Sequence, residues 1–143
     1  MDHDAFRPGS FFAGRQEDMV RKFIKGMDLS SMWELEKCGA KYYDHGAEKN
    51  ILKIMKDYDV DTIRLRLWND PYSEEGVSYG AGENSLEHVI WMGQQVTEAG
   101  MGVLLNFHYS DFWADPGKQI KPKAWAHMGV KELEQAVYDY TVD

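Results

Sequence analysis

Three short apolar segments lie along the chain, and each ends in a polar or aromatic cluster. They are residues 23–28 (FIKGMD), 62–68 (TIRLRLW) and 102–108 (GVLLNFH). Apolar runs of this length, bounded by turns or polar breaks, predict buried β-strands. Ile24, Ile63 and Val103 hold corresponding positions in these segments, about 40 residues apart.

Helical patterns fill the intervals between and after these segments. Residues 48–58, 85–99 and 130–142 place apolar side chains at helical spacing, and the second pattern starts at a plausible N-cap, Asn84 or Ser85, and stops at Gly100. Alternating strands and helices predict an α/β fold with right-handed crossovers and a parallel sheet. Eight units of about 40 residues would close a barrel of roughly 320 residues. This chain holds three units, a number that also suits a small open sheet.

Composition and charge exclude several classes of partner. The net charge of -8 argues against nucleic acid, since binding phosphates needs a basic face. No apolar run is long enough to span a membrane. The single cysteine, Cys38, excludes an internal disulfide and a cysteine-based zinc cluster, and we expect neither a metal nor a cofactor.

The N-terminal residues 1–22 predict a loosely attached extension, with one domain over residues 23–143. The extension has no basic region followed by a long apolar stretch, so a secretory signal is not seen. We therefore expect a cytoplasmic protein if this N-terminus is native, and a secreted one otherwise.

The two loops that follow the second and third strands are long and rich in aromatic residues. They cover residues 69–84 and 109–125, whereas the loops at the opposite ends of the strands are short. Long loops on one side of a compact scaffold are more often binding loops than spacers, which places the functional face at the carboxyl ends of the strands. The loop aromatics either pack in the core or stack against sugar rings, and they are Tyr72, Tyr79, Trp113 and Trp125.

The candidate polar groups lie at the same strand ends. His108 and Asp111 could act as a general base with its orienting carboxylate, as half of a metal site, or as a pair that positions a substrate or supports the site. A metal needs about three protein ligands, and no second histidine cluster lies nearby in the sequence.

Two arginines share one face of the second strand. Arg66 lies closer than Arg64 to the strand end and is the better candidate for the site, while a salt bridge is the alternative for either. Asp28, at the end of the first strand, either accepts a hydrogen bond at the pocket floor or caps the turn that follows.

Three short sequence segments resemble those of a known family. The segments FIKGMDLSS (23–31), IRLRLWNDP (63–71) and FHYSDFWADP (107–116) resemble the N-terminal part of glycoside hydrolase family 53, the endo-β-1,4-galactanases that cut arabinogalactan. The resemblance implies a (β/α)8 barrel, of which this chain holds about three β/α units and stops after the third helix. It also implies that eight residues line the cleft or lie next to it: Asp28, Arg66, Trp68, Asn69, His108, Tyr109, Asp111 and Trp113.

The resemblance further implies a retaining mechanism with two glutamates. The family's acid/base glutamate follows an asparagine at the end of the fourth strand, and its nucleophile ends the seventh, so we expect both to lie beyond Asp143. Retaining hydrolysis needs both carboxyl groups. We therefore expect hydrolysis of β-1,4-galactosidic bonds from the family, and no catalytic residue in this chain and no hydrolysis from it alone. The alternative is a non-catalytic carbohydrate-binding or assembly fragment.

The expected partner is β-1,4-galactan or a galacto-oligosaccharide. Because an open three-stranded sheet leaves its edges unpaired, we also expect marginal stability and self-association through these edges.

Overall fold

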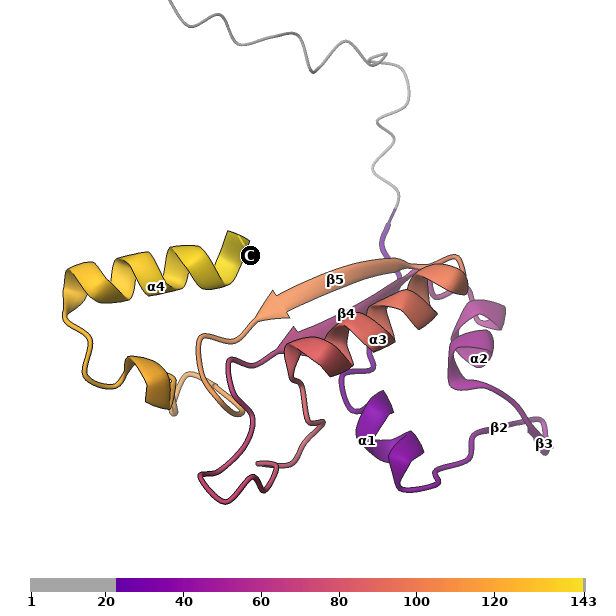
Figure 1. Cartoon of the computed structure of the whole chain (residues 1–143). Helices are drawn as coiled ribbons and strands as arrows, with labels where there is room; N and C mark the ends of the chain where they lie inside the picture. Colours follow the sequence, from indigo (N-terminus) through magenta and orange to yellow (C-terminus); the bar gives the residue numbers. More distant parts are fainter. Residues whose placement is uncertain (1–22, 143) are drawn as a thin grey trace, which may run out of the picture.

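A computed structural model describes residues 23–142, and the predicted extension over residues 1–22 lies outside the described residues. Asp143, beyond which we expect the two catalytic glutamates, also lies outside them, so their predicted placement stays a prediction. The core is a parallel sheet in the order β1-β4-β5, formed by β1 (Gly26–Asp28), β4 (Thr62–Leu67) and β5 (Gly102–Phe107). The prediction of three parallel strands joined through helices is confirmed (Figure 1).

The register differs from the predicted one in the first strand. Ile63 stands opposite Met27 and Val103, so Met27 rather than Ile24 is the corresponding residue. The pairing starts at Gly26 because β4 itself begins at Thr62, opposite Gly26. Phe23 and Ile24 therefore precede the strand and are exposed.

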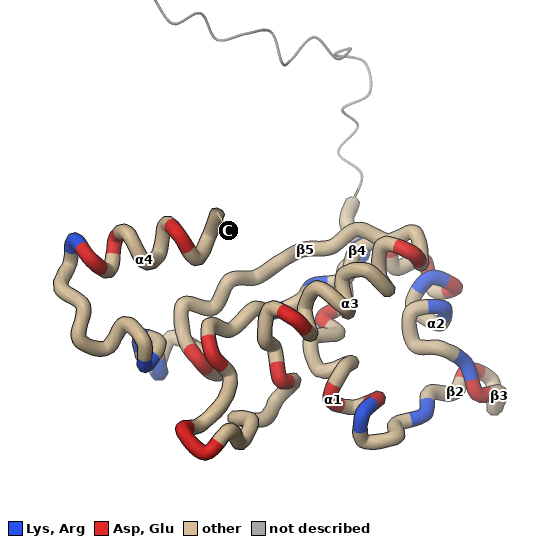
Figure 2. The backbone as a smooth tube through the Cα atoms, viewed as in Figure 1, with Lys and Arg blue, Asp and Glu red and all other residues tan. Residues whose placement is uncertain are grey.

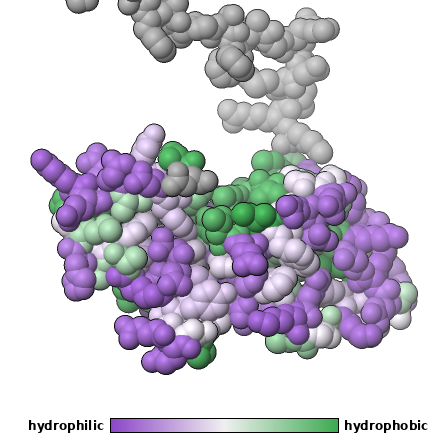
Figure 3. All heavy atoms as spheres, viewed as in Figure 1, coloured by the Kyte–Doolittle hydropathy of each residue, from purple (hydrophilic) through white to green (hydrophobic). Residues whose placement is uncertain are grey.

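Only the central strand is buried as predicted. Ile63 and Leu65 of β4 are fully buried, whereas Leu104 of β5 is 46% exposed and Met27 of β1 is also exposed. The reason is position, since β4 has a neighbour on each side while β1 and β5 each have one. Figure 3 shows hydrophobic atoms gathered along β5.

Helix α3 (Leu86–Glu98) covers the sheet and forms the core with it. Its Val89, Met92 and Val96 are buried in one cluster with the apolar side chains of β4. The side chain of Ser85 caps its start by accepting a hydrogen bond from the backbone N–H of His88, and Gly100, at φ 72°, follows its end. Both boundary predictions are confirmed.

The remaining helices lie around this core. They are α1 (Met32–Lys37), α2 (Ile51–Asp57), the short 3-10 helix η1 (Lys123–Trp125) and α4 (Val130–Val142). Helix α4 has no buried residue and lies apart from α3 in Figure 1. No helix within residues 23–142 is long and apolar enough to cross a membrane.

Two elements were not predicted from the sequence, helix α1 and a hairpin of β2 (Tyr43–Asp44) and β3 (Ala47–Glu48). The hairpin turns at His45 and Gly46, both at positive φ, as a two-residue hairpin requires. Because the hairpin takes up Glu48, α2 starts later than predicted, after Asn50, whose side chain caps it.

Candidate functional site

The candidate site lies on the face of the sheet opposite α3, at the carboxyl ends of the strands. Residues paired across parallel strands point to the same face, and Arg64 pairs with both Asp28 and Leu104, while Arg66 pairs with Asn106. This alternation sends the leucines of β4 into the core and its arginines to the other face. The shared-face prediction for Arg64 and Arg66 is confirmed.

Asp28 is held by its neighbours in the turn and on β4. Its Oδ1 accepts hydrogen bonds from the backbone N–H (2.9 Å) and the hydroxyl (2.6 Å) of Ser30, and its Oδ2 forms an ion pair with Arg64. Burial works to raise the pKa of Asp28, but the Ser30 hydrogen bonds and the charges of Arg66 and Arg64 outweigh it and hold the pKa below its ordinary value. Asp28 therefore caps the turn as a carboxylate, one of its two predicted roles.

Arg66 is buried, with 6% of its surface exposed. Its Nη2 donates to the backbone carbonyl of Ala81 at 3.2 Å and to the Ser31 hydroxyl at 3.4 Å. Its guanidinium carbon lies 4.6 Å from the centre of the Trp113 ring and 5.9 Å from that of Trp68. Burial lowers the pKa of Arg66, but a guanidinium keeps its charge at any physiological pH.

Trp113 is the exposed member of this arrangement, and Trp68 is the buried one. Trp113 is 47% exposed, while Trp68 is buried behind Arg66 and its backbone N–H donates to the Asn84 carbonyl at 2.9 Å. A cation against one aromatic ring fixes the orientation of that ring and adds about 0.5–2 kcal/mol of attraction. Trp113 therefore presents an aromatic surface to solvent and is supported from inside by a charge.

His108 lies between the two tryptophans, with ring centres 6.4 Å from Trp68 and 6.2 Å from Trp113. It is 9% exposed, and its Nδ1 has no hydrogen-bond partner within the described residues. Burial, together with the positive charges of Arg66 and Arg64, lowers its pKa. His108 is thus neutral at pH 7, with one ring nitrogen protonated and the other an acceptor.

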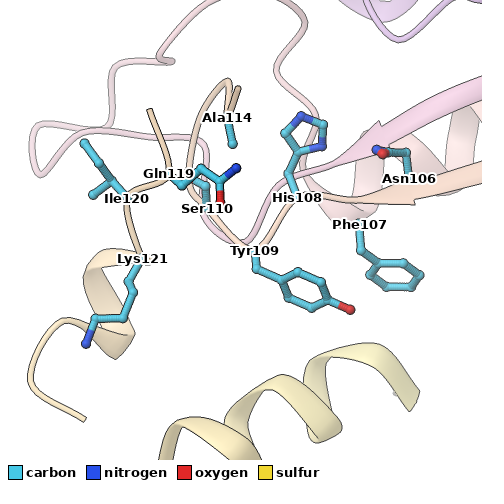
Figure 4. Close-up of a pocket in the computed structure, with 9 residues that line it drawn as sticks. All are labelled: Asn106, Phe107, His108, Tyr109, Ser110, Ala114, Gln119, Ile120 and Lys121. Atoms are coloured by element: carbon cyan, nitrogen blue, oxygen red, sulfur yellow. The ribbon is translucent and has the colours of Figure 1, made fainter. Parts of the chain in front are cut away.

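A cavity of about 400 Å³ lies beside His108 and beyond the free edge of β5 (Figure 4). Its lining includes Ser110, whose buried hydroxyl also has no partner within the described residues. In Figure 4, Tyr109 and Phe107 point toward α4, while His108 points away from it. Hydrogen-bonding groups and an apolar wall thus share one cavity.

Asp111 does not orient His108. Its Oδ1 accepts the backbone N–H of Asp70 at 3.0 Å, and its Oδ2 accepts that of Lys123 at 2.7 Å. Both oxygens are therefore used in joining two loops, which fits the scaffolding interpretation rather than that of a base with its orienting acid. No three histidine, cysteine, aspartate or glutamate side chains within residues 23–142 gather to hold a metal.

Two predicted aromatics face the helical layer instead of the site. The Tyr109 hydroxyl lies 3.0 Å from that of Thr141 in α4, and its ring contacts Trp125 and Tyr140. Trp125 is buried, so of its two predicted roles it takes the one in packing and not the one in sugar stacking. Tyr109 alternates with His108 along the chain, and for this reason it lines the cavity from the α4 side only.

Asn69, two residues after the end of β4, is half-buried, and its backbone N–H donates to the Ser110 carbonyl at 3.0 Å. The sequence did not predict the turn over residues 80–83, in which all four residues have positive φ: Gly80, Ala81, Gly82 and Glu83. This turn supplies the carbonyl that Arg66 binds. Its signal in the sequence is the pair of glycines, Gly80 and Gly82.

Comparisons with known proteins match most of the chain to one family. Residues 24–143 match Glycosyl hydrolase family 53. The chain is 42% identical over 136 residues to an endo-beta-1,4-galactanase of Bacillus subtilis and 43% identical over 122 residues to an arabinogalactan endo-beta-1,4-galactanase of Cellvibrio japonicus. These matches cover 94% and 85% of this chain, but only 32% and 31% of the relatives.

Solved structures give the same result. The GH53 catalytic domain of Ignisphaera aggregans aligns with a TM-score of 0.81 at 48% identity, over 83% of this chain and 33% of that domain. A structure of fungal beta-1,4-galactanases aligns with a TM-score of 0.72 at 34% identity, over 82% of this chain and 33% of that one. The fold is a portion of a (β/α)8 barrel, and the chain spans about a third of the length of its relatives. The chain belongs to glycosyl hydrolase family 53.

Proposed function

We propose that this chain forms part of the galactan-binding cleft of an endo-β-1,4-galactanase. The observation that carries the proposal is the exposed ring of Trp113, supported from inside by Arg66 and flanked by a neutral His108, at the strand ends of a family 53 fold. A galactose ring offers an apolar C–H face and several hydroxyls. An exposed aromatic face beside the neutral imidazole of His108 complements both features.

Each of the eight residues has a role in this proposal. Trp113 stacks on a sugar ring, and His108 exchanges a hydrogen bond with a hydroxyl. Arg66 and Trp68 hold these two side chains from within. The other four position the strand ends and their loops: Asp28, Asn69, Tyr109 and Asp111.

We further propose that the chain binds galactan without cutting it. Retaining hydrolysis needs two carboxyl groups about 5–5.5 Å apart across the scissile bond. Among the described residues, the carboxylates at the strand ends are bound to other groups, Asp28 to Ser30 and Arg64 and Asp111 to two backbone amides. Neither is available as a nucleophile or as a proton donor.

Calorimetric titration of the chain with β-1,4-galacto-oligosaccharides tests the binding proposal. Trp113→Ala should weaken binding about tenfold, which corresponds to ~1.4 kcal/mol. Tyr138→Ala, which removes an exposed aromatic of α4, is the matched control and should leave binding unchanged. Equal affinity of the Trp113→Ala variant and the unmodified chain would contradict the proposal.

A second candidate, assembly, rests on the edge of the sheet. Strand β5 carries no charged side chain and no proline, and Val103, Leu104 and Leu105 are each at least 40% exposed. Figure 2 shows β5 free of charge between charged helices and loops. An uncharged, exposed edge strand is a template for pairing with another strand, so we propose that the chain associates with itself through β5.

A further inference from the structure

We propose that Lys123 is a positioning residue for galactan. With Asp70 and Asp111 it forms an interloop latch, which joins the loop after β4 to the loop after β5 and fixes the exposed ring of Tyr79 relative to Trp113. The proposal rests on the proposed function, since it takes galactan as the ligand of these rings.

The interloop latch is a closed set of hydrogen bonds. Asp111 accepts the backbone N–H groups of Asp70 (3.0 Å) and Lys123 (2.7 Å). The ammonium group of Lys123 then returns to the first loop, where it contacts the Asp70 carbonyl at 3.2 Å, the Tyr72 carbonyl at 2.6 Å and the Asp70 carboxylate at 2.6 Å. The loops meet although Lys123 is 53 residues from Asp70 in sequence.

The chemistry of Lys123 indicates that it holds loops and does not contact substrate. An ammonium group has three N–H donors, and three acceptors of the first loop occupy them. Asp111, at the centre of the interloop latch, is 3% exposed. The bonds therefore join a buried carboxylate to a lysine with no spare donor.

The interloop latch controls the position of an exposed aromatic ring. The backbone N–H of Tyr79 donates to the Pro71 carbonyl at 2.9 Å, between the two carbonyls that Lys123 binds. The Tyr79 ring lies edge-on to the Phe112 ring, with 5.4 Å between the two ring centres, and Phe112 precedes Trp113 in the sequence. Tyr79 is 43% exposed. Tyr79 and Trp113 thus come from different loops, and their spacing depends on the bonds of Lys123.

From this arrangement we expect the effect of the interloop latch on affinity to depend on the length of the galactan ligand. A short ligand that contacts one ring does not sense the spacing between two rings, whereas a longer galactan chain that contacts both does. Loss of the interloop latch should therefore weaken binding of galactotetraose more than that of galactobiose. A merely structural role would weaken both to the same extent.

The test compares Lys123→Met with the unmodified chain, in calorimetric titrations with β-1,4-galactobiose and β-1,4-galactotetraose. We expect a loss of at least fivefold for galactotetraose and less than twofold for galactobiose. Asp70→Asn, which keeps the backbone bonds and removes the carboxylate, should lie between the two proteins. Lys53→Met, at an exposed lysine of α2, is the control and should match the unmodified chain.

Amide hydrogen exchange reads the interloop latch without any ligand. The backbone amides at positions 70 and 123 should exchange at least tenfold faster in Lys123→Met than in the unmodified chain, while the β4 amides keep their protection. Unchanged exchange, unchanged galactotetraose affinity or an equal loss for both ligands would overturn the positioning role. If the unmodified chain binds neither ligand, the proposed function fails and the positioning role with it, whereas the exchange result still decides whether the interloop latch exists.

Discussion

The guanidinium carbon of Arg66 lies 4.6 Å from the centre of the Trp113 ring. This contact joins the central strand of the sheet to the loop after β5. Arg66 is buried and Trp113 is exposed, so the contact passes from the inside of the sheet to the surface. The same guanidinium binds the carbonyl of Ala81 in the loop after β4. One side chain of β4 thus orients both loops that form the rim.

Arg66→Met should weaken binding of galacto-oligosaccharides about fivefold, or ~1 kcal/mol, because Trp113 loses the cation that fixes its ring. Methionine retains most of the apolar volume, so the fold should survive. Calorimetric titration measures the affinity, and urea unfolding checks that the variant is folded. An affinity equal to that of the unmodified chain would show that Trp113 does not need this support.

The stability of the chain should depend on the ionisation of His108. Its pKa in the folded state lies below the value of about 6.5 expected in the unfolded chain. The stabilisation that the folded chain gains from neutral His108 is therefore complete above about pH 6.5. It is lost as the pH falls through this value toward the pKa of His108 in the folded state. Asp28, whose folded pKa is also lowered, adds a second loss at more acidic pH, below its ordinary value of 3.8.

Urea unfolding at about pH 7.5 and about pH 5.5 measures the contribution of His108. In the unmodified chain, the free energy of unfolding should be lower at the more acidic pH than at the higher one. The His108→Gln variant should show a smaller decrease. An identical pH dependence in both proteins would contradict the assignment to His108.

Gly82→Ala should destabilise the chain by about 3 kcal/mol or more. Gly82 has a φ of +128°, and an added Cβ would lie 2.7 Å from the Ser30 carbonyl oxygen and 2.6 Å from the Asn84 amide nitrogen. Gly76→Ala is the matched control, since Gly76 also has positive φ (+75°) but open space around its Cβ, and it should cost only about 1 kcal/mol. Equal unfolding free energies for the two variants would show that the contact at Gly82 has no role.

Leu104→Lys should reduce self-association of the chain, because a charge on an exposed strand disfavours edge-to-edge pairing. Leu104 of β5 is 46% exposed, and Ile90 of α3, at 52%, offers the control Ile90→Lys away from the strand. Light scattering after size-exclusion chromatography gives the molar mass. Two results would contradict the proposed edge pairing: a monomeric unmodified chain, or a Leu104→Lys variant that forms the same oligomer as the unmodified chain.

The sequence predicted those parts of the fold that depend on local patterns. The helical spacing, the Ser85 cap and the Gly100 stop placed α3 within two residues, and the apolar run 62–68 identified the central strand. Burial could not be predicted in this way. The run 102–108 is as apolar as the central one, yet β5 is exposed because burial depends on a neighbouring strand, not on composition.

The candidate site was predicted in its residue types but not in its connections. The choice of Arg66 over Arg64 as a site residue stays a prediction: Arg64 forms an ion pair with Asp28, while Arg66 binds the Ala81 carbonyl in the loop after β4. The bond from Lys123 to Asp70 spans 53 residues, and no local pattern encodes a contact of that range. For the same reason, the sequence suggested a pair of His108 and Asp111, neighbours along the chain, where the structure uses Asp111 to join loops.

The release of reducing ends from β-1,4-galactan measures directly whether this chain cuts galactan without the rest of the barrel. The chain alone is compared with a chimera in which it replaces the matching third of the Bacillus subtilis endo-beta-1,4-galactanase. We expect that the chimera cuts galactan and that the chain alone binds it but releases no reducing ends. Cleavage by the chain alone would contradict the proposal that it binds galactan without cutting it, and acids such as Asp111 or Asp115 would then have to perform the chemistry.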